Sequence, residues 1–394
     1  MAKSGLDFQN TENAFAHKND EELAKSRRLF QLMNNRSLVA LSSALGLKAV
    51  QFNLPFSKYA IKKTIFEQFV AGETLLDSQK TIDQLYQSNT LTILDYGAES
   101  KTTETDLNNV KEETLRAVRL AASNNSVPAI STKLTGLAQN SLLEKLNTGE
   151  ILTEAEQINF SKFYNRLDEI CQKAHELRVS IFVDAEESWM QVAIDTLVDE
   201  MMEKYNKDRV CVWNTYQLYR KDKLQFLKDS HEKAQEGNYL IGAKLVRGAY
   251  MDKEARWAEE HGLENPIQTS KENTDKDYDA ALKYCVDHYE EIGSCCASHN
   301  AASNLYQADL IEDRGLDKKH PHLNFCQLYG MSDIITFNLA AAGYNVAKYL
   351  VYGPVKEVLP YLIRRAKENS SVTGDMSREL KLVVTEMKRR GLIT

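Results

Sequence analysis

Short apolar runs recur along the chain and alternate with amphipathic stretches. Eight runs are rich in β-branched and aliphatic residues, which is typical of buried strands. They cover residues 91–96, 128–133, 180–186, 210–216, 241–250, 294–298, 323–328 and 346–351. Between them, segments such as 104–123, 160–175, 190–204 and 277–291 carry apolar residues at helical spacing. The pattern predicts that strands and helices alternate through most of the sequence.

The strand runs indicate an α/β protein with a parallel sheet. Near-continuous apolar strands such as IGAKLV (241–246) are buried on both faces in parallel sheets. Eight strand–helix units close most simply into a (βα)8 barrel, and an open doubly wound sheet is the alternative. Neither GxGxxG after the first strand nor GxxxxGK[ST] occurs, so no dinucleotide-binding fold or P-loop is indicated. We expect a helical segment over residues 1–90 and the barrel over residues 91–394.

Composition and charge narrow the functional classes. The chain has 394 residues, of which 43% are hydrophobic, enough for a large core. The net charge is −7 and Lys and Arg are dispersed, so we expect no nucleic-acid partner. No apolar run approaches a membrane-spanning length, and the first residues do not resemble a signal or transit peptide. We expect a cytoplasmic protein, or a mitochondrial one if a targeting segment precedes this sequence.

The cysteines and histidines suggest neither disulfides nor a metal site. The six cysteines form no CxxC pair and lie mostly in apolar runs, as buried reduced thiols do. The eight histidines include no HExxH motif and no close His/Cys cluster. We therefore expect no metal.

Polar residues follow most of the predicted strands. In a parallel barrel the active site forms at the carboxyl ends of the strands, so these residues are candidates for function. They are Lys133, Asp184, Asn214, Lys244, Arg247, Tyr250, His299 and Tyr352. Each has a structural alternative, since a rim lysine can pair with a carboxylate and an aspartate can cap the next helix. Their common location on one rim favours a polar cup that binds a ligand.

A probable helix after the eighth strand carries an unusual group of side chains. Tyr361, Arg364, Arg365 and Glu368 are spaced i, i+3, i+4 and i+7, which places them on one helix face. Two adjacent guanidinium groups grip a carboxylate well, and the aromatic ring beside them suits a small amino or hydroxy acid. The alternative is a solvated, weakly ion-paired surface. The position after the last strand, where the helix can lean over the barrel mouth, favours the ligand site.

Several motifs resemble the proline dehydrogenase family, flavin enzymes that oxidise L-proline. They are ISTKLTG around Lys133, VDAEES around Asp184, NTYQ (214–217), KLVRGAY (244–250), SHN (298–300), QLYGM (327–331), YGPV (352–355) and YLIRRAKEN (361–369). Single motifs are weak evidence, but KLVRGAY, SHN and YLIRRAKEN in this order are specific. NTYQ and YGPV are similar to the eukaryotic-type branch, which includes monofunctional bacterial members.

The resemblance implies a barrel variant whose last helix lies over the carboxyl ends of the strands. It also implies FAD as the cofactor, bound across strands four to six. The residues that match the cofactor-binding positions are Asn214, Lys244, Arg247, Ala249, Thr269, Lys271 and His299. Among these, the match is weakest for Thr269, Lys271 and His299.

The resemblance also assigns substrate residues. Lys133, Arg364 and Arg365 would hold the proline carboxylate, and Glu368 would orient this basic cluster. Asp184 would hydrogen-bond Tyr352, so that Lys133, Asp184 and Tyr352 form the catalytic set. The ring methylenes would contact Tyr250, Leu328, Tyr352 and Tyr361.

The implied reaction converts L-proline to 1-pyrroline-5-carboxylate. Electrons would then pass from the flavin to a membrane quinone, which requires a peripheral membrane contact. Because the product is 1-pyrroline-5-carboxylate, we also expect the protein to be functionally coupled to a pyrroline-5-carboxylate dehydrogenase.

Three alternatives stay open at this point. Hydroxyproline dehydrogenases share the fold but carry a smaller residue at the position of Tyr352, so the tyrosine favours proline. A Schiff-base aldolase or lyase could use Lys133 or Lys244 as its nucleophile. A barrel without catalytic activity could bind a partner through its N-terminal helices.

Overall fold

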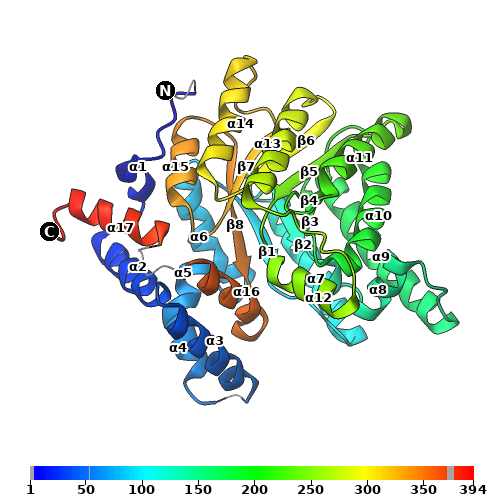
Figure 1. Ribbon diagram of the computed structural model, residues 1–394, viewed down its shortest axis with the longest axis horizontal. Coiled ribbons are helices and arrows are strands. Elements are labelled where there is room, and N and C mark those ends of the chain that lie inside the picture. Colours follow the sequence, from blue (N-terminus) through cyan, green and yellow to red (C-terminus); the bar gives the residue numbers. More distant parts are fainter. Residues whose placement is uncertain (1–3, 53, 371–376) are drawn as a thin grey trace. The chain divides into compact units, whose positions relative to one another are not determined.

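The computed structural model describes residues 4–52, 54–370 and 377–394. Its eight strands follow one another in chain order around a closed parallel barrel (Figure 1). The strands are β1 (Leu91–Tyr96), β2 (Ala129–Thr132), β3 (Ser180–Val183), β4 (Val212–Gln217), β5 (Ile241–Val246), β6 (Ile292–Ala297), β7 (Leu323–Leu328) and β8 (Val346–Tyr352). The predicted (βα)8 barrel is confirmed, and the open doubly wound sheet is excluded.

The elements described before β1 are all helical, as predicted. They are α1 (Thr11–Phe15), α2 (Asp20–Met33), α3 (Arg36–Gln51), α4 (Ser57–Ile61), the π-helical turn η1 (Lys62–Phe66), α5 (Glu67–Phe69) and α6 (Leu75–Gln87). Later helices are α7 (Glu104–Ala122), the 3₁₀ turn η2 (Leu134–Gly136), α8 (Asn140–Thr148), α9 (Glu154–Glu176), α10 (Ser188–Tyr205), α11 (Lys223–Gly237), α12 (Met251–His261), α13 (Lys271–Asp287), α14 (Ala301–Asp313), α15 (Asp333–Ala341), α16 (Val355–Glu368) and α17 (Arg378–Arg389).

Contacts along the chain define two compact units. The first unit comprises Met1–Gly5 and Ala98–Cys326, and therefore contains β2 to β6 with their helices. The second unit comprises Leu6–Gly97 and Gln327–Thr394, and therefore contains β1, β8, the N-terminal helices and α15 to α17.

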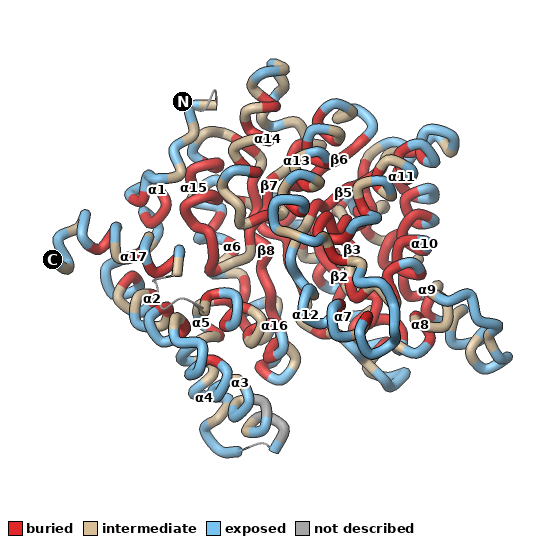
Figure 2. The backbone as a smooth tube through the Cα atoms, in the orientation of Figure 1, coloured by how far each residue is buried: buried red, intermediate tan, exposed pale blue. Residues whose placement is uncertain are grey.

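Burial on both faces explains the apolar character of the strands. Every residue of β2, β4 and β8 is buried (Figure 2). Parallel pairing sets Asn214 of β4 beside Ala243 of β5, and Thr215 beside Lys244. Polar side chains in such strands need partners inside the protein, because burying them unpaired costs free energy.

Two segments differ from the prediction for identifiable reasons. The run at 241–250 is not strand throughout: β5 ends at Val246, the chain turns at Gly248 with a φ of 81°, and α12 begins at Met251. Glycine adopts that φ far more readily than other residues. Helix α9 begins earlier than the predicted residue 160, because Thr153 and Glu156 form a capping box at its start.

Gly330 lies in the turn after β7, where the backbone of α5 passes close by. Its φ is 78°, and a Cβ atom at this position would lie 2.1 Å from the carbonyl oxygen of Gln68. The side-chain amide of Gln68 in turn donates to the carbonyl oxygen of Gly330 at 3.0 Å. A residue without a side chain is therefore required for this close approach.

We expect Gly330→Ala to lower the free energy of unfolding by about 3 kcal/mol, because a backbone clash adds to the cost of a positive φ. Gly343→Ala is the matched control, since Gly343 has a φ of 89° but no atom within 4 Å of the added Cβ. It should cost only about 1 to 2 kcal/mol. Denaturant unfolding of both variants checks this, and equal losses would show that the approach of Gln68 does not matter.

Glu186 is a buried carboxylic acid shortly after β3. It accepts hydrogen bonds from the backbone N–H and the hydroxyl of Thr135, at 3.0 and 2.5 Å. Burial nevertheless has the largest effect and raises the pKa of Glu186 to about 7, while the two hydrogen bonds act in the opposite direction. Between its ordinary pKa of 4.5 and about 7, the folded protein therefore holds a proton that the unfolded chain has lost.

Stability should fall as pH rises through this window, because the folded state binds the extra proton. The expected contribution of Glu186 is at most about 3 kcal/mol. The variant Glu186→Gln should lose this part of the pH dependence. As pH rises from 5 to 7.5, its free energy of unfolding should therefore increase relative to that of the parent. Denaturant unfolding at several pH values measures the difference, and parallel curves for the two proteins would contradict a raised pKa.

Candidate active site

A three-residue charge cluster joins the ends of β2, β3 and β5 in the first unit. The Nζ atom of Lys133 lies 3.1 Å from one carboxylate oxygen of Asp184, and the Nζ atom of Lys244 lies 2.5 Å from the other. The hydroxyl of Ser131 also donates to Asp184, at 3.0 Å. The sequence predicted these three charged residues on one rim, and the structure brings them together.

The three charged side chains of this cluster are largely buried. The side chains of Lys133, Asp184 and Lys244 are 11%, 14% and 8% exposed. At this burial an ion pair interacts more strongly than at the surface. The cluster therefore holds the ends of these strands together through strong electrostatic contacts.

Asn214 is fixed by a buried polar network at β4. Its side-chain amide donates to Asp195 at 3.0 Å, and Asp195 forms an ion pair with Lys223. All three residues are buried. The network holds the Asn214 side chain in one orientation, which is what a residue that positions a ligand requires.

A second cluster in the first unit centres on Asp275 of α13. Asp275 forms ion pairs with Arg247 and Lys271. The guanidinium of Arg247 also donates to Ser303 at 2.6 Å and lies 3.7 Å from the centre of the Tyr278 ring. These contacts orient two cations beside the N-terminus of α13.

The remaining predicted cofactor residues occupy three positions of the first unit. Thr269 accepts a hydrogen bond from Asn273 at 2.9 Å just before α13. Ala249 is exposed in the turn after β5, and His299 is half-buried in the turn after β6.

Several buried polar atoms of the first unit make no hydrogen bond within the described part of the chain. Two of them are Nε of Arg247, a predicted cofactor residue, and the side-chain carbonyl oxygen of Gln217, at the end of β4 in the NTYQ motif. Leaving such groups unpaired costs free energy, and a ligand bound beside Arg247 would supply a partner there.

Helix α16 of the second unit carries the predicted Arg face. Arg365 donates to Glu368 at 2.6 Å, and its guanidinium carbon lies 5.2 Å from the centre of the Tyr361 ring. Arg365 and Tyr361 are buried, whereas Arg364 is half-buried and Glu368 is exposed. Burial raises the pKa of Tyr361 to about 12, so its hydroxyl stays protonated at neutral pH.

Arg365 and Tyr361 each keep one unused hydrogen-bond donor. Nε of Arg365 and the hydroxyl oxygen of Tyr361 are buried and make no hydrogen bond to any described residue. A carboxylate is the partner that suits a guanidinium best. This face therefore has the chemistry of an acid-binding site rather than of a solvated surface.

An aromatic pair lies near the end of β8 in the second unit. The ring of Tyr352 is 5.4 Å from that of Tyr96 at the end of β1, with which β8 pairs. Tyr352 is only 1% exposed, and Leu328 at the end of β7 is half-buried. In the first unit, Tyr250 is half-buried at the start of α12.

Sequence reasoning missed several partners of these residues. Asp275 could have been found, because it follows Lys271 by four residues on a helix, the spacing of an ion pair. Asp195 and Lys223 could not, because nothing in their local sequence indicates that they meet at Asn214. Ser131 was visible in the ISTKLTG motif, but its bond to Asp184 depends on the pairing of β2 with β3.

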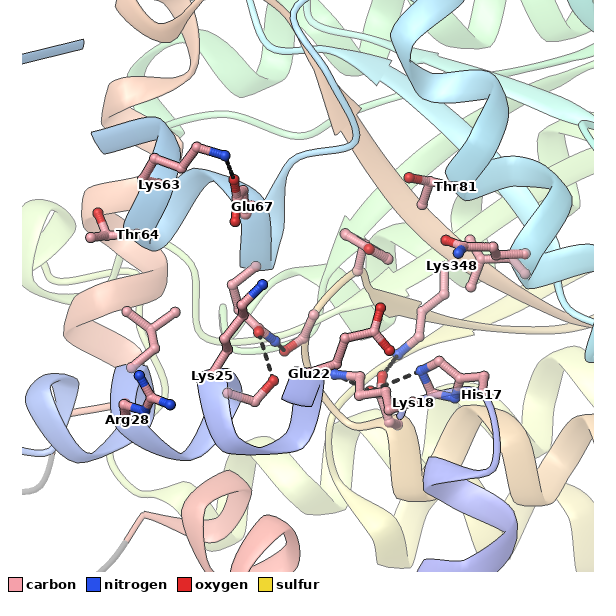
Figure 3. Close-up of a pocket in the computed structure, with 18 of the residues that line it drawn as sticks. His17, Lys18, Glu22, Lys25, Arg28, Lys63, Thr64, Glu67, Thr81 and Lys348 are labelled. Carbon is pink, nitrogen blue, oxygen red and sulfur yellow. Dashed lines mark hydrogen bonds and ion pairs between the residues drawn. The ribbon is translucent and has the colours of Figure 1, made fainter. Parts of the chain in front are cut away.

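A cavity of about 620 Å³ lies elsewhere in the second unit (Figure 3). Its lining includes His17, Lys18, Asp333 and Lys348, but none of the predicted site residues. Lys348 and Asp333 form a buried ion pair at 2.8 Å, which Lys18 joins at 3.4 Å. These three charges form an ion-paired cluster of their own, apart from the predicted site residues.

Comparison with known proteins identifies the family. The model of the proline dehydrogenase family matches residues 78–378. A mitochondrial proline dehydrogenase 1 from Dictyostelium discoideum is 34% identical, over 91% of this chain and 69% of that protein. A hydroxyproline dehydrogenase from Xenopus laevis is 32% identical, over 99% of this chain and 91% of that protein.

Solved structures agree in fold. A proline utilization A protein from Bdellovibrio bacteriovorus superposes with a TM-score of 0.71 over 92% of this chain and 38% of its own, at 21% identity. This chain thus spans less than half of that larger protein, and at this identity the likeness shows the fold alone. Since the family model covers most of the sequence and two curated relatives exceed 30% identity, the chain belongs to the proline dehydrogenase family of flavin-dependent oxidoreductases.

Proposed function

We propose that this protein oxidises L-proline to 1-pyrroline-5-carboxylate with FAD as its cofactor and passes the electrons to a quinone. The observation that carries this proposal is the buried pair of unused donors on Arg365 and Tyr361. An amino acid carboxylate supplies the acceptor that the guanidinium lacks. The proposal accounts for a buried Arg whose partner Glu368 occupies only part of its donor set.

The first unit has residues that fit FAD. Arg247 and Lys271 lie beside the N-terminus of α13, a helix of 17 residues, where cations and backbone N–H groups favour a pyrophosphate. The unpaired Nε of Arg247 supports a ligand there. Asn214 and Lys244 are the polar groups we assign to the isoalloxazine, with Ala249 in the exposed turn nearby in sequence.

Two further residues complete the cofactor assignment. Thr269 precedes α13, and we assign its hydroxyl to the ribityl or pyrophosphate region. His299 follows β6 and is assigned to the adenosine side. The bound FAD would accept a hydride from the proline carbon next to nitrogen.

The protein's own part in the reaction is to bind and orient the substrate. In the second unit, Arg364 and Arg365 would bind the carboxylate, Glu368 would orient Arg365, and Leu328, Tyr352 and Tyr361 would contact ring methylenes. In the first unit, Tyr250 is assigned to the ring and Lys133 to the carboxylate. Hydride loss from carbon and proton loss from the amine together give the imine product. The positive charge of Lys133 would favour the neutral amine that this step needs.

The lysine contacts argue against a Schiff-base enzyme. A Schiff base requires a neutral amine, which is usually obtained by removing the lysine from carboxylates. Lys133 and Lys244 instead share Asp184, which stabilises their charged forms. We therefore assign Asp184 to holding Lys133 and Lys244.

We expect Arg365→Met to raise the KM for proline roughly 10- to 100-fold, because a charge-assisted contact to the carboxylate is lost. FAD content should stay at the parental level. Arg116→Met is the matched control, since Arg116 lies on the exposed face of α7 and pairs with Glu113 of the same helix. Steady-state kinetics with each purified protein gives the comparison, and an unchanged KM for Arg365→Met would remove the carboxylate role.

A second substrate has support from the relatives, because the Xenopus laevis protein is named a hydroxyproline dehydrogenase. The bulk of Tyr352, which is almost fully buried, favours the unsubstituted ring here. We expect Tyr352→Ser to shift the ratio of kcat/KM values toward 4-hydroxyproline by roughly 10-fold or more. Tyr352→Phe is the control that keeps the bulk. If both variants leave the ratio at the parental value, Tyr352 does not set ring selectivity.

The product defines the next reaction. The cyclic imine opens by hydrolysis to an aldehyde, which an aldehyde dehydrogenase can oxidise. We propose that a pyrroline-5-carboxylate dehydrogenase acts downstream and is functionally coupled to this protein.

A further inference from the structure

The charge of the N-terminal helices departs sharply from that of the whole chain. Residues 23–66 contain eight Lys or Arg residues and no Asp or Glu, although the protein as a whole carries a net charge of −7. The sequence prediction that basic residues are dispersed is therefore wrong for this segment. A stretch of this length without a single acid is a local positive surface on an acidic protein.

The same segment exposes large apolar side chains. Leu38, Leu41 and Leu45 follow one another at helical spacing on α3, and all three are exposed. The turn from α3 to α4 carries Phe52 and Phe56, which are 75% and 83% exposed.

More apolar surface continues into α4, and together these residues form a hairpin tip. Leu54 and Tyr59 are 52% and 63% exposed. Figures 1 and 2 show α3 and α4 lying side by side with an exposed outer surface. We call residues 36–63 the basic hairpin.

The cations of the basic hairpin lie close to its apolar residues in sequence. Arg36, Lys48 and Lys58 are exposed, and no described carboxylate pairs with them. Lys62 and Lys63 at its base pair with Glu73 and Glu67. The tip therefore keeps its positive charge while the base is held to the rest of the second unit.

Exposed apolar side chains that alternate along the sequence with Lys and Arg are the composition of a segment that lies in a membrane interface. Phe and Leu insert at the boundary of the acyl chains, and the cations attract anionic headgroups. None of the described helices is long and apolar enough to span a bilayer. The chemistry is that of binding along the membrane plane.

We propose that the basic hairpin is a peripheral membrane anchor that binds the surface of bilayers containing anionic phospholipids. The basic hairpin would bring the enzyme to the membrane that holds its quinone, so the role of the anchor rests on the proposed function. The position is consistent with that purpose, because α3 and η1 both pack against α16, the helix that carries Arg365. A second copy of this chain is a poorer occupant, because two such tips would repel each other.

The test is flotation of the purified FAD-loaded protein with two kinds of vesicle. One contains phosphatidylcholine alone, and the other contains phosphatidylcholine with about 30 mol% phosphatidylglycerol, an anionic content to which basic segments respond. We expect binding to the anionic vesicles at least about 10-fold stronger than to the neutral ones, and weaker in high salt. Phe52→Ser/Phe56→Ser and Lys48→Glu/Lys58→Glu should each lose at least about 10-fold in vesicle partitioning. Leu76→Ser/Ile151→Ser is the matched control, because those residues are 84% and 94% exposed outside the hairpin.

Each outcome bears on the proposal. Absence of vesicle binding, equal binding to both lipid mixtures, or hairpin variants that bind like the parent would overturn it. A dimer in solution that the Phe52/Phe56 variant abolishes, without vesicle binding, would identify a second copy as the occupant and also overturn it. Flavin reduction by proline without vesicles is measured in parallel. Reduction without lipid binding rejects only the anchor, whereas lipid binding without reduction rejects only the proposed reaction.

Discussion

The pairing of one carboxylate with two ammonium groups at the strand ends organises the first unit. Asp184 fixes Lys133 at the end of β2 and Lys244 within β5, so a single side chain connects three strands. Removing Asp184 would take a carboxylate from two largely buried cations, which costs far more than losing an exposed ion pair would.

In the second unit, a buried charged side chain is only partly paired. Arg365 is buried next to an aromatic ring, and one carboxylate, Glu368, takes only part of its hydrogen-bonding capacity. A purely structural arginine would be expected to have its donors satisfied. The unsatisfied Nε of Arg365 distinguishes it from exposed ion pairs such as Arg116 with Glu113 on α7, and it supports the proposed carboxylate site.

The sequence predicted the barrel because its strands are apolar enough to be buried on both faces, and that pattern depends only on local residues. It predicted the face of α16 for the same reason, since helical spacing alone brings Tyr361 and Arg365 together. It could not predict the network of Asn214, Asp195 and Lys223, which depends on how α10 and α11 meet β4. The sequence analysis also missed the basic hairpin, because the net charge of the whole chain conceals a segment in which all the charged residues are positive.

The most direct test of the central claim is the absorbance spectrum of the purified protein before and after L-proline is added without oxygen. The account predicts flavin bands between about 350 and 500 nm that bleach on adding proline, because the cofactor takes up the hydride. Flavin bands that persist with proline would contradict the proposed substrate. A colourless protein that cannot be reconstituted with FAD would contradict the cofactor assignment and the reaction built on it.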